Sequence, residues 1–297
     1  MKILVARHTK LFFKDKGMFL TSLITPMILL LLYATFLGNV YESSFRLSLP
    51  NGLPEVEEIL DGLVGGQLIS SILAVSAVTV SFCSNMLMVQ DKANGSIRDF
   101  TVSPVHPFTL SLSYFIASMF STLLICFTAS ALCFVYVACI GWYMSFLDVI
   151  LVLGDVILLV LFGTALSGCI GHFLSTQGQV SAVGSMVSSC YGFLCGAYMP
   201  ISQFSEGLRN AISFLPGTHG TSLLRSHALR GVLAYMEEKN YPPKALEEIR
   251  DAVDCNLYLF DFQFSDLTKF AFLAITVLVL LGLYLFISYR KGKKIHG

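Results

Sequence analysis

Charged side chains are unusually scarce in this chain. Asp, Glu, Lys and Arg together make up 13% of its 297 residues, about half of the roughly 25% that soluble domains carry. Hydrophobic residues make up 55%, and the mean hydropathy is +0.73. So few charges could not cover a water-exposed surface of this size, whereas lipid tails accept an apolar exterior. The composition therefore argues against a soluble fold and predicts an integral membrane protein.

Several signatures of binding and catalysis are also missing. The net charge is zero and there is no concentrated basic face, which argues against a nucleic-acid partner. Most of the eight cysteines lie in apolar runs without C-x-x-C or Cys/His spacing, so we interpret them as apolar packing residues rather than metal ligands. The chain has no G-x-x-x-x-G-K-[ST] phosphate-binding loop, Ser/Lys dyad or H-E-x-x-H set. We expect no catalytic residue, metal or cofactor on this chain.

Six apolar stretches are long enough to cross a bilayer, which requires about 20 residues of helix. They predict an all-α integral membrane protein with six transmembrane helices in a single domain over 1–297. The second and third stretches are the longest, so we expect these helices to tilt or to extend beyond the membrane. The predicted spans are 18–40, 63–90, 108–140, 146–171, 179–199 and 268–289.

Basic residues flanking the first and last stretches predict the orientation. The leader and the tail are rich in Lys and Arg, whereas the segment after the first span is mostly acidic. Because short cytoplasmic segments carry the excess of Lys and Arg, we expect both termini in the cytoplasm, which requires an even number of spans. The leader also places three basic residues on one helical face, namely Arg7, Lys10 and Lys14. This pattern fits an N-terminal interfacial amphipathic helix facing membrane lipids or a partner, or simply a topology signal.

The segment 90–107, between the second and third spans, predicts a short helix at the membrane surface. Asn94-Gly95 favours a turn, and Ser96 with Asp99 resembles a capping box. Ile97 and Phe100 would form a small apolar ridge, which suits docking into a groove on a cytoplasmic partner. We therefore assign docking to Asn94, Gly95, Ser96, Ile97, Arg98, Asp99, Phe100, Ser103 and Pro104.

This segment resembles the cytoplasmic coupling helix of type-2 ABC transporter permeases, through Gly95-Ser96, the residues Ile97 to Phe100, and Ser103-Pro104. The family's glutamate-rich lead-in is replaced here by Gln90 to Asn94. The outer region 200–266 continues the resemblance, with predicted outer re-entrant or interfacial helices between spans 5 and 6. The residues that carry this outer motif are Gly196, Pro200, Leu208, Ile212 and Pro216.

The resemblance implies a permease subunit of an ABC exporter in a bacterial plasma (inner) membrane. In that family two permeases pair, as a homodimer or heterodimer, and each docks a cytoplasmic ATPase that holds ATP and Mg²⁺. The expected cargo is amphipathic, lipid-linked or drug-like. Asp155, a carboxylate within the fourth span, leaves an alternative open. It is either a contact on a substrate path, as in an ATP-independent proton-coupled carrier or channel, or a carboxylate near the outer surface that is solvated or bonded to a neighbouring Ser or Tyr.

Overall fold

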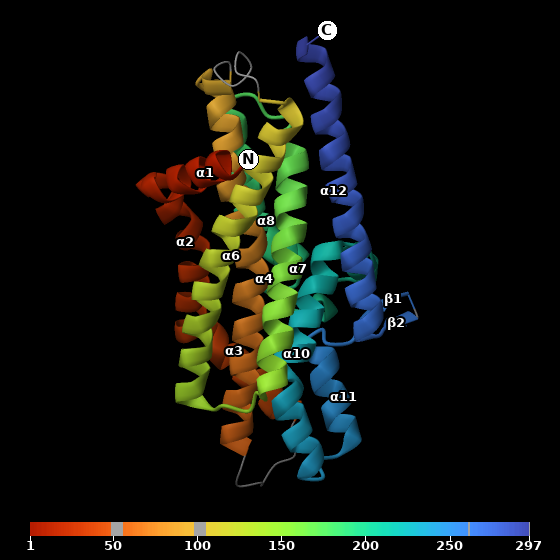
Figure 1. The fold of residues 1–297 in the computed structure, drawn as a ribbon. Coiled ribbons are helices and arrows are strands. Elements are labelled where there is room, and N and C mark those ends of the chain that lie inside the picture. The colour runs from red at the N-terminus through yellow and green to blue at the C-terminus, as the bar shows by residue number, and fades with distance from the viewer. Residues whose placement is uncertain (49–55, 98–104, 261, 297) are drawn as a thin grey trace.

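The computed structural model describes residues 1–48, 56–97, 105–260 and 262–296. These residues form an elongated bundle of helices with both chain termini at the same end (Figure 1). The all-α membrane fold is confirmed, with one small addition. The strands β1 (Leu257–Leu259) and β2 (Phe262–Phe264) pair antiparallel, with Leu257 opposite Phe264, in a hairpin that precedes the last helix.

The N-terminal part begins with α1 (Lys2–Lys14), which crosses the bundle near the end that carries the termini (Figure 1). The helix α2 (Lys16–Leu32) follows at once, because the Asp15 carboxylate caps it by accepting a hydrogen bond from the backbone N–H of Met18. A π-helical turn, η1 (Tyr33–Leu37), then leads without a break into α3 (Gly38–Ser48).

The helix α4 (Val56–Ala93) lies at the centre of the bundle and is buried along most of its length. It is surrounded by α2, α6 (Pro107–Ile140), α7 (Phe146–Gly171), α8 (Gln177–Leu194) and α10 (Pro216–Glu238). Small residues allow this close packing. A Cβ atom on Gly66 would lie 2.5 Å from Leu229, and one on Gly163 would lie 3.0 Å from the Cα atom of Val78.

Five helices are long and apolar enough to cross a membrane. They correspond to predicted spans 18–40, 63–90, 108–140, 146–171 and 268–289. The second helix begins earlier than predicted, at Val56, and its acidic first turn lies outside the apolar stretch from which the span was predicted. The last of them belongs to α12 (Asp266–His296). The stretch predicted as the fifth span, 179–199, is not among these five. Its helix, α8, contains Gln177, Gln179 and several serines, and it ends at Leu194.

Between α7 and α12 the described chain passes along the bundle once more, in two pieces. The helix α8 contacts the C-terminal half of α4, where Gly184 meets Met86, whereas α10 contacts the N-terminal half of α4 through Gly66. Between them lie a loop, the short 3-10 helix η2 (Ile201–Gln203) and α9 (Glu206–Ser213). The passage from α7 back to the start of α12 is therefore made by a broken helix, and α11 (Pro243–Ala252) follows it at the far end (Figure 1).

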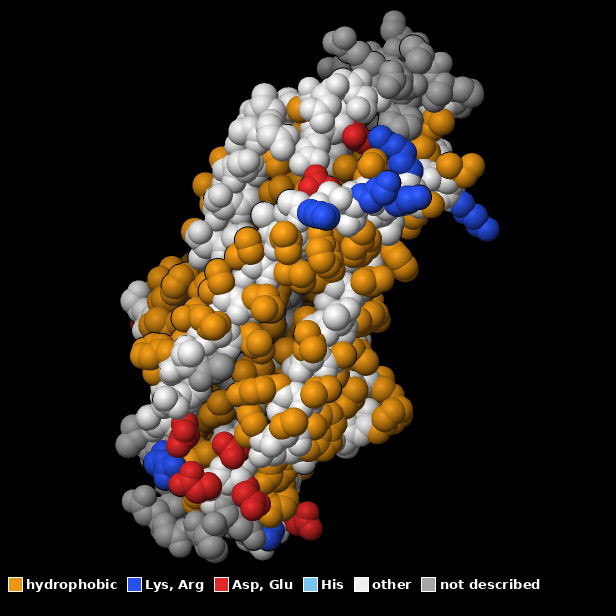
Figure 2. Space-filling view, turned by 90° about the vertical axis from the view of Figure 1, so that its left-hand side faces the viewer, with side chains coloured by type: hydrophobic (Ala, Val, Ile, Leu, Met, Phe, Trp, Pro, Cys, Tyr) orange, Lys and Arg blue, Asp and Glu red, His pale blue; other side chains and the backbone are white. Residues whose placement is uncertain are grey.

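Side-chain types are segregated along the bundle. On the face shown in Figure 2, Lys and Arg gather at the end where the termini lie, Asp and Glu gather mostly at the opposite end, and a broad apolar band separates them. The exposed apolar side chains of this band include Leu20, Ile24 and Leu31 of α2. An apolar belt between two polar ends is the surface that a bilayer requires.

Candidate functional site

The end of α4 leads into the segment that resembles a coupling helix. A turn follows at Asn94 and Gly95, where Gly95 has a φ of +77°, a conformation that glycine adopts without steric cost. Ser96 and Ile97 then begin a new helical turn, and both are partly exposed. The predicted turn is thus present, and its docking role stays a prediction. The remaining residues assigned to this segment lie outside the described residues, namely Arg98, Asp99, Phe100, Ser103 and Pro104.

One turn before Asn94, the buried carboxylate of Asp91 joins three helices. It accepts a hydrogen bond from the Tyr114 hydroxyl of α6 at 2.5 Å and forms a 3.1 Å ion pair with Arg7 of α1. The next residue, Lys92, donates to the carbonyl of Gly171 at the end of α7, at 2.7 Å. The last turn of α4 is therefore held to α1, α6 and α7. It lies directly beside the turn at Asn94 and Gly95, which we call the coupling turn.

The buried face of α1 is formed by His8 and Phe12. The His8 ring stacks on Tyr114 with 3.9 Å between centroids, and its Nδ1 lies 3.1 Å from an Arg7 guanidinium nitrogen. Burial, assisted by the nearby Arg7 charge, lowers the pKa of His8 to about 4. Arg7, predicted to share a basic face with Lys10 and Lys14, is partly buried and pairs with Asp91, and the interfacial role of this face stays a prediction. Lys10 and Lys14 are exposed.

Asp155 is buried in α7 and bonded to a neighbour. Its carboxylate lies 2.6 Å from Nδ1 of His227, which α10 brings alongside. This geometry agrees with the interpretation of a bonded carboxylate, although the partner is a histidine rather than the expected Ser or Tyr. His227 itself could not be paired with Asp155 from the sequence, because 72 residues separate them.

The break between α8 and α9 contains the predicted outer motif. Gly196 has a φ of +74°, and a Cβ atom there would lie 2.8 Å from Ile201, so the tight loop requires glycine. Pro200 is buried just before η2, Ile212 is buried on α9, and Pro216 begins α10. Leu208, also on α9, is 46% exposed, and the re-entrant or interfacial role of this motif stays a prediction.

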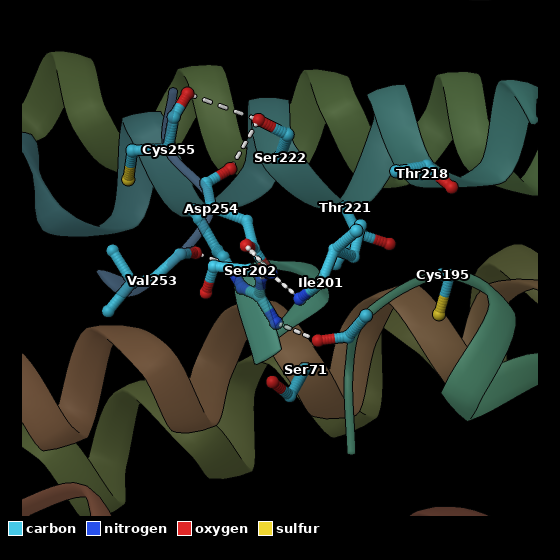
Figure 3. A network of polar contacts seen from close by, with 12 residues as sticks. Ser71, Cys195, Ile201, Ser202, Thr218, Thr221, Ser222, Val253, Asp254 and Cys255 are labelled. Carbon is cyan, nitrogen blue, oxygen red and sulfur yellow. Dashed lines mark hydrogen bonds and ion pairs between the residues drawn. The ribbon is translucent and has the colours of Figure 1, made fainter. Parts of the chain in front are cut away.

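Sequence reasoning missed the ion pair that supports this break. The guanidinium of Arg225, on α10, is fully buried and lies 2.9 Å from the Asp254 carboxylate. Arg225 also donates to the carbonyls of Gly196 and Val253. Asp254 in turn accepts from the backbone N–H groups of Ile201 and Ser202, and Figure 3 shows these two residues gathered beside it. The pair therefore satisfies backbone groups that the interrupted helix leaves without partners.

The exposed face of α8 differs from those of the other long helices. It carries many small and polar side chains, including Gln177, Ser181, Ser185, Ser189 and Cys190, beside the exposed apolar residues Met186, Phe193 and Leu194. The exposed face of α2 consists mostly of Leu, Ile and Met. A polar helical face is unfavourable against hydrocarbon and suits contact with protein or water.

The comparison with known families agrees with this architecture. Residues 1–229 match the model of the ABC-2 type transporter. The chain belongs to the ABC-2 type transporter family. No curated protein matches the chain.

The ABC-2 match covers the chain from α1 into α10, and so includes Asp91, the coupling turn and Asp155. The chain is therefore a membrane permease of the ABC transporter type, and its family implies an ATPase partner. The C-terminal part of α10, α11, the hairpin and α12 lie beyond the matched residues.

Proposed function

We propose that this ABC-2 protein is the membrane-spanning subunit of an ATP-driven exporter that moves an amphipathic, lipid-linked or drug-like molecule outward. Two permease copies would pair, and each would dock a cytoplasmic ATPase that binds ATP and Mg²⁺. The observation that carries the proposal is the attachment of the coupling turn to the central helix. Asn94 follows directly on α4, whose last turn is bonded to α1, α6 and α7 through Asp91 and Lys92.

This attachment provides a mechanical route. A force applied by an ATPase to Ser96 and Ile97 would act on the end of α4, and α1, α6 and α7 would follow because they are tied to it. Because α4 is packed along most of its length, it would move as a rigid element and change the access to a path at the permease interface.

The proposed topology has six crossings with both termini in the cytoplasm of a bacterial cell. The sixth crossing would be the broken passage of α8 and α10, since an even number of crossings is needed to return the C-terminus to the side of the N-terminus. The gathering of Lys and Arg at the end that carries the termini supports this orientation (Figure 2). The buried, hydrogen-bonded loop at Gly196 supports it too, because irregular backbone is tolerated at membrane depth only when protein covers it.

We assign the second permease copy to the polar face of α8. Cys190 lies exposed on that face, and Cys139 lies exposed on α6, so the natural cysteines supply a test. A short thiol cross-linker applied to the protein in membranes should give dimers through Cys190. The Cys190→Ser variant should give none, and Cys139→Ser should cross-link normally. Dimers that depend on Cys139 alone would contradict the assignment.

The docking role is tested at Ile97. Replacing it with Asp should abolish co-purification with the partner ATPase while membrane insertion stays intact, because a carboxylate cannot enter an apolar groove without a large desolvation cost. Ile97→Leu serves as the matched control and should bind normally. Retained ATPase binding by the Asp variant would refute the coupling proposal. Full transport by Asp155→Asn would exclude the ATP-independent carrier, which family membership already disfavours.

A further inference from the structure

A cleft of about 720 Å³ lies between α10, α11, the hairpin and the first turn of α12. We call it the outer cleft. Its charged and titratable lining residues are His227, Arg230, Glu237, Arg250, Asp266 and Lys269. The volume is within the usual range for a site that takes a small molecule, roughly 300–1,000 Å³. None of the roles proposed above for the coupling turn, Asp91 or α8 uses it.

The outer cleft carries charges of both signs. Lys269 lies 2.8 Å from Asp266, and Arg250 lies 3.2 Å from Glu237. The two acids are more than half exposed at their side chains, so each can bind a further cation while keeping its present partner. A lining of this kind does not favour a simple anion or a simple cation. It favours a molecule that carries both charges.

Two arginines in the lining retain donors for a ligand. The Arg250 side chain is 44% exposed, and one of its terminal nitrogens binds Glu237 at 3.2 Å, so its outward donors can reach a ligand. Among the described residues, Arg230 pairs with Asp148. The distance of 3.6 Å between Nε of Arg230 and the carboxylate of Asp148 is too long for a hydrogen bond. Guanidinium groups bind phosphate oxygens through charge-assisted hydrogen bonds, so both arginines can hold a phosphate.

The position of the cleft relative to the apolar belt indicates the source of the ligand. Asp266 and Lys269 stand in the first turn of α12, and the apolar side chains exposed on that helix begin beside them with Leu267, Phe270 and Ile275. The cleft therefore lies where the apolar belt ends. In a bilayer this is the level of the lipid headgroups.

We propose that the outer cleft binds the zwitterionic headgroup of a membrane phospholipid. Arg230 and Arg250 hold the phosphate, and Glu237 and Asp266 hold the ammonium group. The acyl chains lie against the apolar start of α12. This site is independent of the proposed export function, because neither the coupling turn nor the dimer face takes part in it.

The test is lipid binding by the purified full chain in detergent, followed by native mass spectrometry. Phosphatidylethanolamine carries both charges, whereas phosphatidylglycerol lacks the ammonium group and should bind about tenfold more weakly, which corresponds to about 1.4 kcal/mol. The double variant Arg230→Gln/Arg250→Gln should lose about tenfold in affinity for phosphatidylethanolamine. Arg46→Gln, which removes an exposed arginine of α3, is the matched control and should bind like the parent.

A second variant guards against misfolding of the first. Ala234 is exposed and lines the cleft, so Ala234→Trp should fill it and weaken binding without changing any charge. Ala6→Trp, at an exposed position of α1, should have no effect. Soluble glycerophosphoethanolamine should displace the lipid from the parent, and its failure to do so in large excess would locate the lipid elsewhere. Unchanged phosphatidylethanolamine binding in both cleft variants would overturn the proposal.

Discussion

The guanidinium of Arg225 and the carboxylate of Asp254 lie 2.9 Å apart in the interior of the bundle, where both side chains are almost fully covered. Arg225 comes from α10, and Asp254 follows α11. Together they bond the backbone on both sides of the break after α8, at Gly196 and at Ile201. The ion pair thus takes the place of the helical hydrogen bonds that the broken passage lacks.

Removal of one partner should therefore destabilise the fold strongly. We expect Arg225→Met to lower the free energy of unfolding by about 3–5 kcal/mol, because it leaves the Asp254 carboxylate buried without a countercharge. The double variant Arg225→Met/Asp254→Leu should cost less than the sum of the two single changes, because no charge is left uncompensated. Unfolding in mild detergent measures all three.

Arg46→Met is the control for the loss of an arginine. Arg46 also pairs with carboxylates, Glu42 and Glu57, but it is exposed, and exposed pairs contribute only about 0–1 kcal/mol. If Arg225→Met cost no more than Arg46→Met, the ion pair would not support the break.

The helix α7 shows how much local sequence can predict. Its boundaries at Phe146 and Gly171 match the predicted span 146–171, because Ser145 and Asp148 form a capping box at its start and a continuous apolar run follows. The break after α8 could not be predicted in the same way. Its support comes from Arg225 and Asp254, which are 29 residues apart, and periodicity within one segment carries no information about that contact.

The site residues divide in the same manner. The turn at Asn94-Gly95 was predictable, since this dipeptide favours a turn wherever it lies. The inward orientation of Arg7 was not, because it depends on Asp91 approaching from α4, 84 residues away. A charged residue at the end of an apolar span, such as Asp91, was the available signal. A single sequence does not reveal its partner.

The Asp91 contacts predict that one substitution will loosen α1. In Asp91→Asn the negative partner of Arg7 is lost, and the hydrogen bond from the Tyr114 hydroxyl becomes weaker. We therefore expect the free energy of unfolding to fall by about 1–3 kcal/mol. Hydrogen exchange of the amides in residues 2–14 should become faster, because α1 would open locally. Glu248→Gln, which neutralises an exposed acid on α11, should change neither quantity. Unchanged exchange in Asp91→Asn would show that α1 is held without this carboxylate.

Two glycines of α7 provide a matched pair for the packing of the bundle. A Cβ atom on Gly163 would lie 2.9 Å from the Ser81 hydroxyl and 3.0 Å from the Val78 backbone, whereas one on Gly154 would meet nothing within 4 Å. We expect Gly163→Ala to destabilise the protein by about 1–3 kcal/mol through overpacking. Gly154→Ala should instead be neutral or stabilise it by up to about 1 kcal/mol. Equal thermal stabilities of the two variants would contradict this account of the α4–α7 contact.

The lowered pKa of His8 predicts that the stability of the protein depends on pH through this one residue. Folded His8 titrates at about pH 4, whereas in the unfolded chain it titrates near 6.5. Between these pH values the unfolded chain binds a proton that the folded chain does not. The contribution of His8 to the free energy of unfolding is therefore complete above pH 6.5 and falls as the pH is lowered towards 4. The charged groups that face His8 are Arg7 on α1 and Asp91 on α4, and Tyr114 of α6 stacks on its ring.

The expected loss is about 2 kcal/mol between pH 7 and pH 5. His8→Phe keeps an aromatic ring against Tyr114 but cannot take up a proton, so its stability should fall less over the same interval. His106→Gln, which removes an exposed histidine at the same end of the bundle, should follow the parent. Unfolding in detergent at several pH values measures these slopes. A His8→Phe variant as sensitive to acid as the parent would show that another group between α1 and α4 takes up the proton.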